Sequence, residues 1–336
     1  MKKSLIFTAV LATLGTSAFA QSSVSIYGVV DAGISRADNG VSITNGVVSG
    51  GQSASRLGFK GTEDLGGGSS VSFVLESGIS IDTGAITQAN TTFGRQAWVG
   101  FNNDKLGSVK LGLQYAPIRS ALEVIDPFSV SSSGNSLKTL GDGAYVERLT
   151  NSVSYSTPSI SGFSGQVAYG FGETAGNSSA NRNAGLGVNY DNGPLAVRFA
   201  HNNRNINAVG VDSQARESLI GATYNFGMVK GHAAYAQRNL ENNLTATERK
   251  SSNYLLGVTV PFGPHSVMAS YIHNEVRNTS NSDSNQVSLG YAYELSKRTN
   301  LYTNYARYTN DSAVALNVAA NGLTGSQFNA GIRHKF

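Results

Sequence analysis

The alternation of apolar and polar side chains, repeated along the chain, limits the possible folds more than any other feature. Sixteen segments beyond residue 23 place apolar side chains at roughly every second position over about 8–12 residues. Successive side chains of a strand point to opposite faces, so this period predicts β-strands with one apolar face. Strands of this length cross the hydrocarbon layer of a membrane when they are tilted. The expected strands are Val24–Ser35, Ser53–Glu63, Ser70–Ser80, Phe93–Asn102, Ser108–Tyr115, Arg148–Ser156, Phe163–Phe171, Asn183–Tyr190, Leu195–Asn202, Glu217–Phe226, Met228–Arg238, Ser252–Phe262, Ser266–Val276, Gln286–Leu295, Asn300–Thr309 and Gln327–Phe336.

The last segment shows the pattern most clearly and ends the chain on an aromatic residue. One face of the extended chain carries Phe328, Ala330, Ile332, His334 and Phe336, and the other carries Asn329, Gly331, Arg333 and Lys335. A strand with this pattern has an apolar surrounding on one side and water on the other.

The connections between the expected strands form two sets of different length. The short set is rich in Gly, Asn, Asp and Pro, which supply turn dihedrals. It comprises residues 64–68, 103–107, 191–194, 262–264 and 296–298. The long, polar set comprises residues 36–52, 81–92, 173–182, 204–216, 239–250, 278–285 and 310–325. Short turns on one rim and long loops on the other favour a membrane barrel over a β-sandwich or a solenoid.

The longest connection, residues 116–147, has no clear alternation and contains the small-residue tract Ser129–Ser136. Loops longer than about 15 residues without structure of their own are usually functional or disordered.

The first twenty residues predict export. A basic start at Lys2 and Lys3, a short apolar run and the small residues Ala18 and Ala20 are typical of a signal peptide, which we expect to be cleaved after Ala20. Residues 21–336 then form the mature domain. Loss of the two lysines lowers the formal charge from +4 to +2, so the composition disfavours a nucleic-acid partner. With no cysteine, the chain has neither disulfides nor thiolate metal sites.

Four stretches together resemble the general-diffusion porins of Gram-negative bacteria, most closely the beta-proteobacterial branch. They are Ser25–Asp31, Ser55–Gly66, Phe93–Gly100 and Arg333–Phe336. The resemblance covers the whole mature chain and implies an all-β fold: a sixteen-stranded antiparallel transmembrane β-barrel. It also implies a homotrimer in the outer membrane and a constriction loop, residues 116–147, folded into the lumen. Phe336 then corresponds to the terminal residue that serves barrel assembly by the barrel-assembly machinery.

The alternation also predicts which side chains face the lumen. Leu57 and Phe59 are expected outside, which places Arg56 and Lys60 inside. Trp98 is expected outside, which places Arg95 inside. Residues expected inside on the other strands are Asp31, Glu76, Lys110, Arg148, Thr150, Ser152 and Ser154. An Arg or Lys on the lipid face would cost about 2–4 kcal/mol near the midplane.

By the resemblance, Arg56, Arg95 and Arg148 match an arginine cluster on the barrel wall, with Lys60 beside it. Glu123 and Asp126 match acids on the constriction loop. Opposed charges across a narrow wet passage orient dipolar solutes and separate cations from anions. Asp31, Glu76 and Lys110 are expected to belong to the wider lumen wall. As an alternative, the arginines pair with carboxylates to fix loops, or bind lipopolysaccharide near the outer rim.

No motif for catalysis, cofactor binding or metal binding is present, because the five histidines are scattered singly. The chain is therefore expected to be a channel rather than an enzyme. Its predicted function is passive diffusion of ions and small hydrophilic solutes, with a weak preference for anions. The alternatives are a substrate-specific channel for a sugar or a carboxylate, and a barrel whose long surface loops also serve adhesion.

Overall fold

The computed structural model describes residues 23–208 and 211–336, so the expected signal peptide lies outside the described residues. Seventeen β-strands occur in this part of the chain, and every pairing between them is antiparallel. Their bounds are β1 Ser23–Asp38, β2 Ile43–Ser49, β3 Arg56–Gly66, β4 Ser69–Gly78, β5 Gln96–Asn103, β6 Gly107–Tyr115, β7 Arg148–Ser156, β8 Phe163–Gly170, β9 Asn183–Asn192, β10 Leu195–Ala208, β11 Val211–Asn225, β12 Lys230–Asn242, β13 Thr247–Phe262, β14 His265–Val276, β15 Ser284–Glu294, β16 Thr299–Asn310 and β17 Thr324–Lys335.

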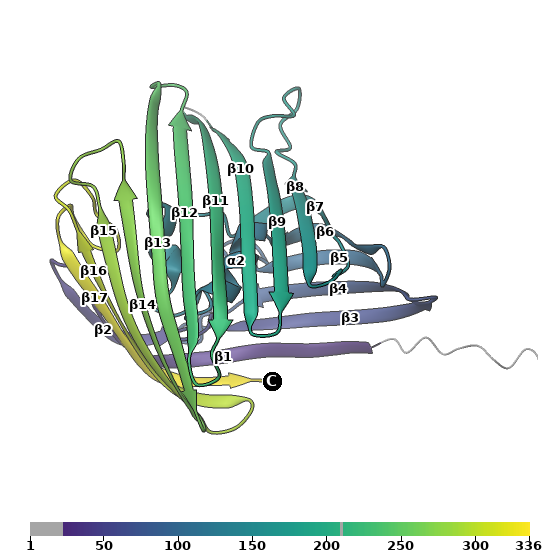
Figure 1. Ribbon diagram of the computed structural model, residues 1–336, viewed down its shortest axis with the longest axis horizontal. Coiled ribbons are helices and arrows are strands. Elements are labelled where there is room, and N and C mark those ends of the chain that lie inside the picture. The colour runs from purple at the N-terminus through teal and green to yellow at the C-terminus, as the bar shows by residue number, and fades with distance from the viewer. Residues whose placement is uncertain (1–22, 209–210) are drawn as a thin grey trace, which may run out of the picture.

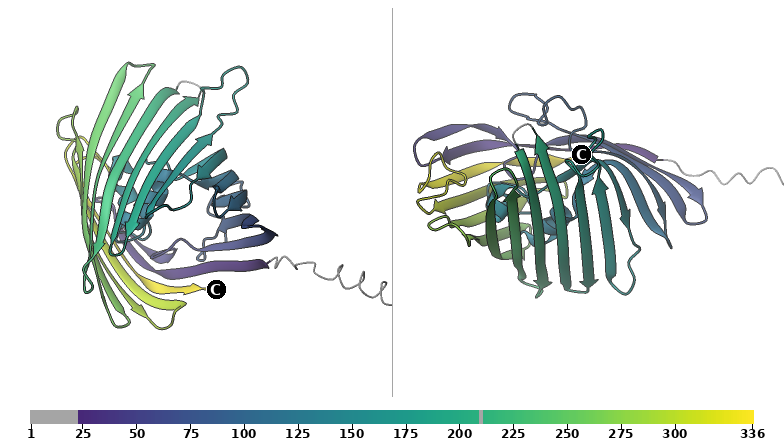
Figure 2. Two further views of the ribbon diagram at one scale, coloured as in Figure 1. Left: turned by 45° about the vertical axis from the view of Figure 1, so that its right-hand side comes forward. Right: turned by 90° about the horizontal axis from the view of Figure 1, so that it is seen from above.

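The strands close into a barrel with sixteen wall positions (Figures 1 and 2). On one side β1 pairs with β17, with Asp31 opposite Arg333. On its other side the first half of β1 pairs with β3 and the second half with β2. Strands β2 and β3 are thus two parts of one wall strand, interrupted at residues 50–55. The predicted sixteen-stranded antiparallel barrel is confirmed.

The chain terminus completes the closure. The backbone N–H of Gly28 donates to the Phe336 carbonyl at 3.1 Å, and the Phe336 N–H donates back at 3.1 Å. A Cβ atom at Gly28 would lie 2.5 Å from the Phe336 ring. The missing side chain of Gly28 therefore leaves the space that the terminal ring occupies on the outer face.

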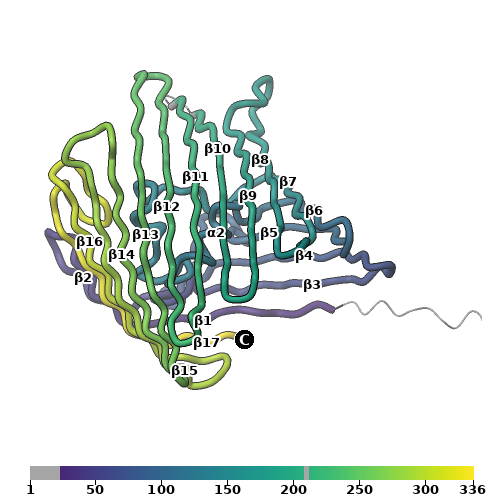
Figure 3. The backbone as a smooth tube through the Cα atoms, viewed as in Figure 1, coloured from purple at the N-terminus to yellow at the C-terminus, as the bar shows by residue number. Residues whose placement is uncertain are grey.

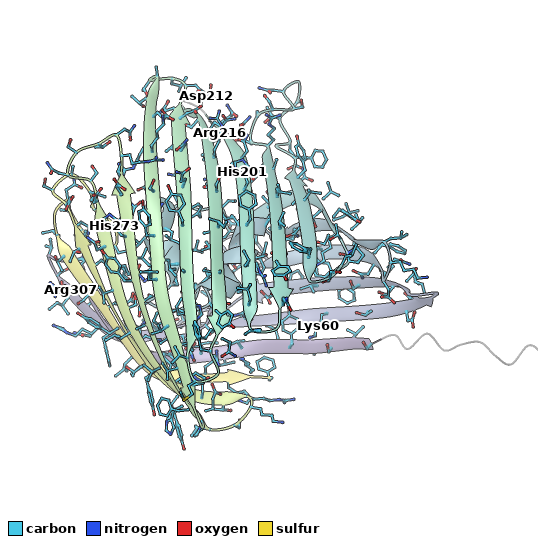
Figure 4. All side chains as sticks on the ribbon, in the orientation of Figure 1. Lys60, His201, Asp212, Arg216, His273 and Arg307 are labelled. Atoms are coloured by element: carbon cyan, nitrogen blue, oxygen red, sulfur yellow. The ribbon has the colours of Figure 1, made fainter. Side chains whose placement is uncertain are left out.

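The two faces of the wall differ in chemistry as the alternation predicted. Apolar side chains such as Ile26, Ile34 and Phe101 are exposed on the outer face, whereas Asp31 and Glu76 are buried on the inner face. Figure 4 shows side chains projecting from both sides of the strands. In β16, Tyr302 and Tyr308 are buried inside, while Leu301 and Tyr305 are exposed outside.

Two expected orientations are wrong. Trp98 faces the lumen. It lies opposite Val74, which is on the same face of β4 as the inward-facing Glu76, and the Lys110 ammonium is 4.3 Å from the centre of the Trp98 ring. Arg95 also points inward, but it precedes β5 and so does not share the alternation of that strand. Thr150 is exposed and Leu149 is 1% exposed, the reverse of the expectation. An irregularity between β6 and β7 and a positive φ of 47° at Asn151 shift the alternation there.

The two rims of the barrel differ in loop length, although the prediction of a long loop is wrong for three of the segments. The long connections include residues 79–95, 116–147, 171–182 and 311–323. By contrast, residues 36–52, 204–216 and 239–250 lie mainly in extensions of β1, β2 and β10 to β13. Beyond the membrane both faces of a strand are polar, so hydrogen-bonded pairing continues there without a period-two signal. The tube in Figure 3 shows the β12–β13 hairpin rising above the neighbouring β14.

Residues 116–147, called the inner loop below, lie against the inner face of the barrel. The loop contains α2 Pro117–Ile125, η1 Ser136–Lys138 and η2 Leu140–Gly143. Its polar groups contact wall strands as distant as β11, where the Glu217 carboxylate accepts from the Val146 N–H, and β16, where the Tyr308 hydroxyl donates to the Ser133 carbonyl. Figure 2 shows α2 surrounded by the wall. Among the described residues no helix is long and apolar enough to cross a membrane.

An apolar core joins the inner loop to the wall. Ile118, Leu122 and Ile125 of α2 are fully buried together with wall residues such as Leu219 and Leu255. Wall glycines make room for side chains of the inner loop: a Cβ at Gly257 would lie 2.4 Å from Pro127, and one at Gly221 would lie 2.6 Å from Ile125. The loop therefore packs closely against wall positions that lack side chains, a complementarity that the sequence alone did not reveal.

Candidate functional site: a basic cavity inside the barrel

A cavity lies between the inner loop and the strands at the barrel closure. It has a volume of about 980 Å³ and is lined by seven basic and two acidic side chains. The basic residues are Arg56, Arg95, Arg119, Lys138, Arg148, Arg333 and Lys335, and the acidic residues are Glu123 and Glu147. The formal excess of five positive charges gives this part of the lumen a positive potential.

Arg95, just before β5, is held by a buried network that joins the strands β1, β4 and β6. Its Nε donates to the Glu76 carboxylate at 2.8 Å, and the Tyr27 hydroxyl donates to the same carboxylate at 2.9 Å. A second guanidinium nitrogen of Arg95 donates to the Tyr115 hydroxyl at 2.9 Å. Arg95 and Glu76 are 6% and 2% exposed, so the geometry is fixed by groups that cannot exchange their partners for bulk water.

The other predicted arginines reach the same cavity with looser constraints. Arg56 donates to the Ala54 carbonyl and to the Ser53 hydroxyl, at 3.1 and 3.0 Å, and forms no ion pair among the described residues. Arg148 donates to the Arg95 carbonyl at 3.0 Å and lies 3.3 Å from the Glu147 carboxylate. Because neutral acceptors hold Arg56, its full charge acts on the cavity.

Glu123 lies in the cavity as expected, and its carboxylate pairs with Arg119 one helical turn earlier at 3.0 Å. Asp126 does not reach the cavity and is only 2% exposed. Its carboxylate accepts hydrogen bonds from the backbone N–H groups of Phe128, Val130 and Ser136 at 2.9, 3.2 and 2.7 Å. Burial raises the pKa of Asp126, and these three donors oppose that rise. Asp126 shapes the loop rather than facing a solute.

The remaining predicted residues belong to the lumen wall outside the cavity. Lys60 lies on the inner face, two residues from Gly58, which pairs with Tyr27, and its ammonium is 5.2 Å from the centre of the Tyr27 ring. Figure 4 labels Lys60 on β3. Asp31 is fully buried and accepts hydrogen bonds from the Tyr302 hydroxyl and from the Gln52 and Ser53 N–H groups. It thereby fixes the interruption between β2 and β3. The ammonium of Lys110 rests on the Trp98 ring.

Sequence reasoning missed several cavity residues. Arg119 and Glu123 have the i, i+4 spacing of an ion pair on a helix, but no helix was expected inside residues 116–147. Arg333 and Lys335 occupy the polar face of the terminal strand, so the alternation of that strand is the signal that points to them. Lys138 donates to the Gln327 side chain at 2.8 Å, and burial lowers its pKa to about 8.

A second ionic cluster anchors the far end of the inner loop. The Asp142 carboxylate accepts from Arg249 at 3.0 Å and from Asn274 at 2.9 Å, and it lies 3.6 Å from Arg238. Burial alone would raise the pKa of Asp142, but the hydrogen bonds and charges of these partners lower it below its usual value. No group of three metal-ligating side chains occurs within the described ranges.

Comparison with known proteins gives one consistent result. Residues 8–313 match a family model described as Gram-negative porin. The chain is 35% identical over 358 residues to outer membrane porin protein 32 of Delftia acidovorans, covering 100% of both chains. Its fold is similar to the anion-selective porin from Comamonas acidovorans, with a TM-score of 0.84 and 31% identity over 94% of this chain and 100% of that one. The trimer form of OmpT from Vibrio cholerae shares the fold at 16% identity, with a TM-score of 0.71 and coverage of 94% and 99%.

Proposed function

The chain belongs to the family of Gram-negative porins, and on this premise we propose that its passage, bounded by the inner loop and the basic cavity, weakly prefers anions. It is an outer-membrane porin that forms a passive diffusion channel for ions and small hydrophilic solutes. Matched relatives are porins, which are channels rather than enzymes.

The excess of basic side chains in the cavity is the observation that supports the anion preference. The lining side chains have a formal excess of five positive charges, of which the charge of Arg95 is paired with Glu76 outside the lining. Protein walls of low dielectric constant concentrate the field of the remaining charges in the space that water fills. The anion-selective porin from Comamonas acidovorans, similar over nearly the whole chain, is consistent with this sign. Several cavity charges are paired, as Arg119 is with Glu123 and Arg148 with Glu147, which keeps the preference weak.

Zero-current potentials in planar bilayers with a potassium chloride gradient test this selectivity. We expect the wild-type potential to have the sign of chloride preference, and Arg56→Ala, Arg95→Ala and Arg148→Ala to shift it toward cation preference. Arg307→Ala is the matched control, because Arg307 is exposed on the outer face of β16 and lies outside the cavity. An unchanged potential in all three cavity variants would exclude these arginines from the selectivity site.

The inner loop is proposed to be the constriction of the channel. Its packing against the wall from β8 to β16 and its contribution of Arg119, Glu123 and Lys138 to the cavity support this role. Lys60, Asp31, Glu76 and Lys110 then act as lumen wall, with Glu76 also positioning Arg95. Deletion of residues 129–135 should raise single-channel conductance if this loop limits the current.

The proposed partners are two further copies of the chain, outer-membrane lipid with lipopolysaccharide, and the barrel-assembly machinery. The shared fold with a trimeric porin supports the homotrimer. Arg36 and Arg307 are exposed near the long-loop rim and form no ion pair among the described residues, which suits contact with lipopolysaccharide phosphates. The role of Phe336 in barrel assembly is tested by Phe336→Ala, which should lower the yield of membrane-inserted barrel.

Export by a signal peptide cleaved after Ala20 completes the proposal. Amino-terminal sequencing of the mature protein should begin at Gln21.

A further inference from the structure

We propose that Tyr115 is the positioning residue of the arginine cluster, and that its ring keeps the Arg119 and Arg148 guanidinium groups facing the passage. This inference rests on the proposed anion preference and adds to it the residue that maintains the charge arrangement. Tyr115 itself is uncharged and is the last residue of the strand β6.

Three arginines from three different elements converge on Tyr115. The Arg119 guanidinium of α2 lies 4.9 Å from the centre of the Tyr115 ring, and that of Arg148 in β7 lies 5.2 Å from it. Arg95, just before β5, donates to the Tyr115 hydroxyl at 2.9 Å. Tyr115 is the last residue of β6 and directly precedes the inner loop, so wall and loop charges meet at one side chain.

Like charges gathered in this way repel one another and need an uncharged group between them that attracts each. An aromatic ring does so, because its electron-rich face attracts a guanidinium without cancelling the charge. Arg119 shows the need most clearly: it is 6% exposed, and its Nε is buried without a hydrogen-bond partner among the described residues. Its ion pair to Glu123 uses a different nitrogen.

The alternative partners of these arginines are close. Arg119 already contacts Glu123, and Arg148 lies 3.3 Å from Glu147. Without the ring, both guanidinium groups can move closer to these carboxylates. Glu123 would then neutralise the charge of Arg119 on the loop, and Glu147 would neutralise the charge of Arg148 on the wall. The passage would then lose positive potential although no charged residue had been changed.

Three variants separate the ring from the hydroxyl and from general effects of substitution. Tyr115→Leu removes the ring, Tyr115→Phe keeps the ring and removes the hydrogen bond from Arg95, and Tyr155→Leu changes an outward-facing tyrosine at the other end of β7. The readouts are the chloride-to-potassium permeability ratio from zero-current potentials and the heat stability of the folded barrel on gels. Tyr115→Met replaces Tyr115→Leu if the latter does not fold.

Tyr115→Leu loses the cation–π contacts to both Arg119 and Arg148. We expect it to lower the permeability ratio by at least about two- to fivefold, the factor that corresponds to one such contact. Tyr115→Phe should stay near the wild-type ratio, and Tyr155→Leu should equal it. An unchanged ratio in Tyr115→Leu, or an equal loss in Tyr115→Phe, would overturn the proposal. If Arg148→Ala shifts the ratio while Tyr115→Leu does not, only the role of Tyr115 fails. If neither shifts it, the proposed selectivity site fails as well.

Discussion

The packing of the inner loop against glycines of the wall gives a quantitative prediction for Gly257. A Cβ atom at this position would lie 2.4 Å from Cγ of Pro127, whereas ordinary contacts begin at 3.4 Å. The proline ring has no flexible end that could move aside, and the backbone oxygen of Ala269 also lies only 3.1 Å from the added Cβ. In Gly257→Ala the loop must therefore move by about 1 Å away from the wall, at a cost of about 1–3 kcal/mol typical of overpacking.

This displacement moves the loop into the passage, so single-channel conductance should fall in Gly257→Ala. The matched control is Gly46→Ala in β2, where an added Cβ meets no atom within 4 Å and φ is not positive. A double variant, Gly257→Ala with Pro127→Ala, removes the clashing ring atoms and should restore conductance toward the wild-type value. The reasoning is refuted if Gly257→Ala and Gly46→Ala have the same conductance and the same heat stability.

Three other features give predictions of their own. Burial lowers the pKa of Lys138 to about 8, so the cavity loses one positive charge as pH rises from about 7 to 9. Chloride preference should fall over that range in the wild type and stay constant in Lys138→Arg. A wild-type chloride preference that does not change with pH would contradict this prediction. Asp126→Asn removes charge from an acceptor of three backbone N–H groups and should cost about 1–3 kcal/mol of loop stability, seen as noisier open-channel current; a quiet channel with wild-type heat stability would argue against it. The pKa of Asp142 is lowered, so its ion pair with Arg249 is present above the unfolded pKa and is lost only as pH falls through the lower folded pKa. Open-channel noise should therefore be constant from about pH 7 to pH 5, and it should rise in Asp142→Asn at neutral pH.

The wall of the barrel could be predicted from sequence because its physics is local. Alternation along a strand reports which face meets lipid, and it placed Arg56, Glu76 and Lys110 on the inner face correctly. The same rule failed at Trp98 and at Thr150, for two different reasons. Trp98 is large and apolar but stacks under Lys110, and Thr150 follows an irregular pairing that reverses the alternation.

The inner loop could not be predicted in the same way because its order depends on distant residues. The α2 helix is buried against strands that come later in the chain, and Gly221 and Gly257 matter only because Ile125 and Pro127 lie against them. Asp126 carries the charge expected of a cavity acid, but its carboxylate turns back to the loop backbone. Tyr115 has no charge that would draw attention to it, and its role depends on three arginines that only the fold brings together.

The absence of cysteine from the chain allows the most direct test of a water-filled passage bordered by the inner loop. Ser131→Cys places a single thiol on the loop surface that lines the cavity, and Ile26→Cys places one on the exposed outer face. A charged, water-soluble methanethiosulfonate reagent should reduce the current through open Ser131→Cys channels in steps, and leave the current through Ile26→Cys channels unchanged. An unmodified current through Ser131→Cys channels, with labelling absent in the same protein, would contradict the account.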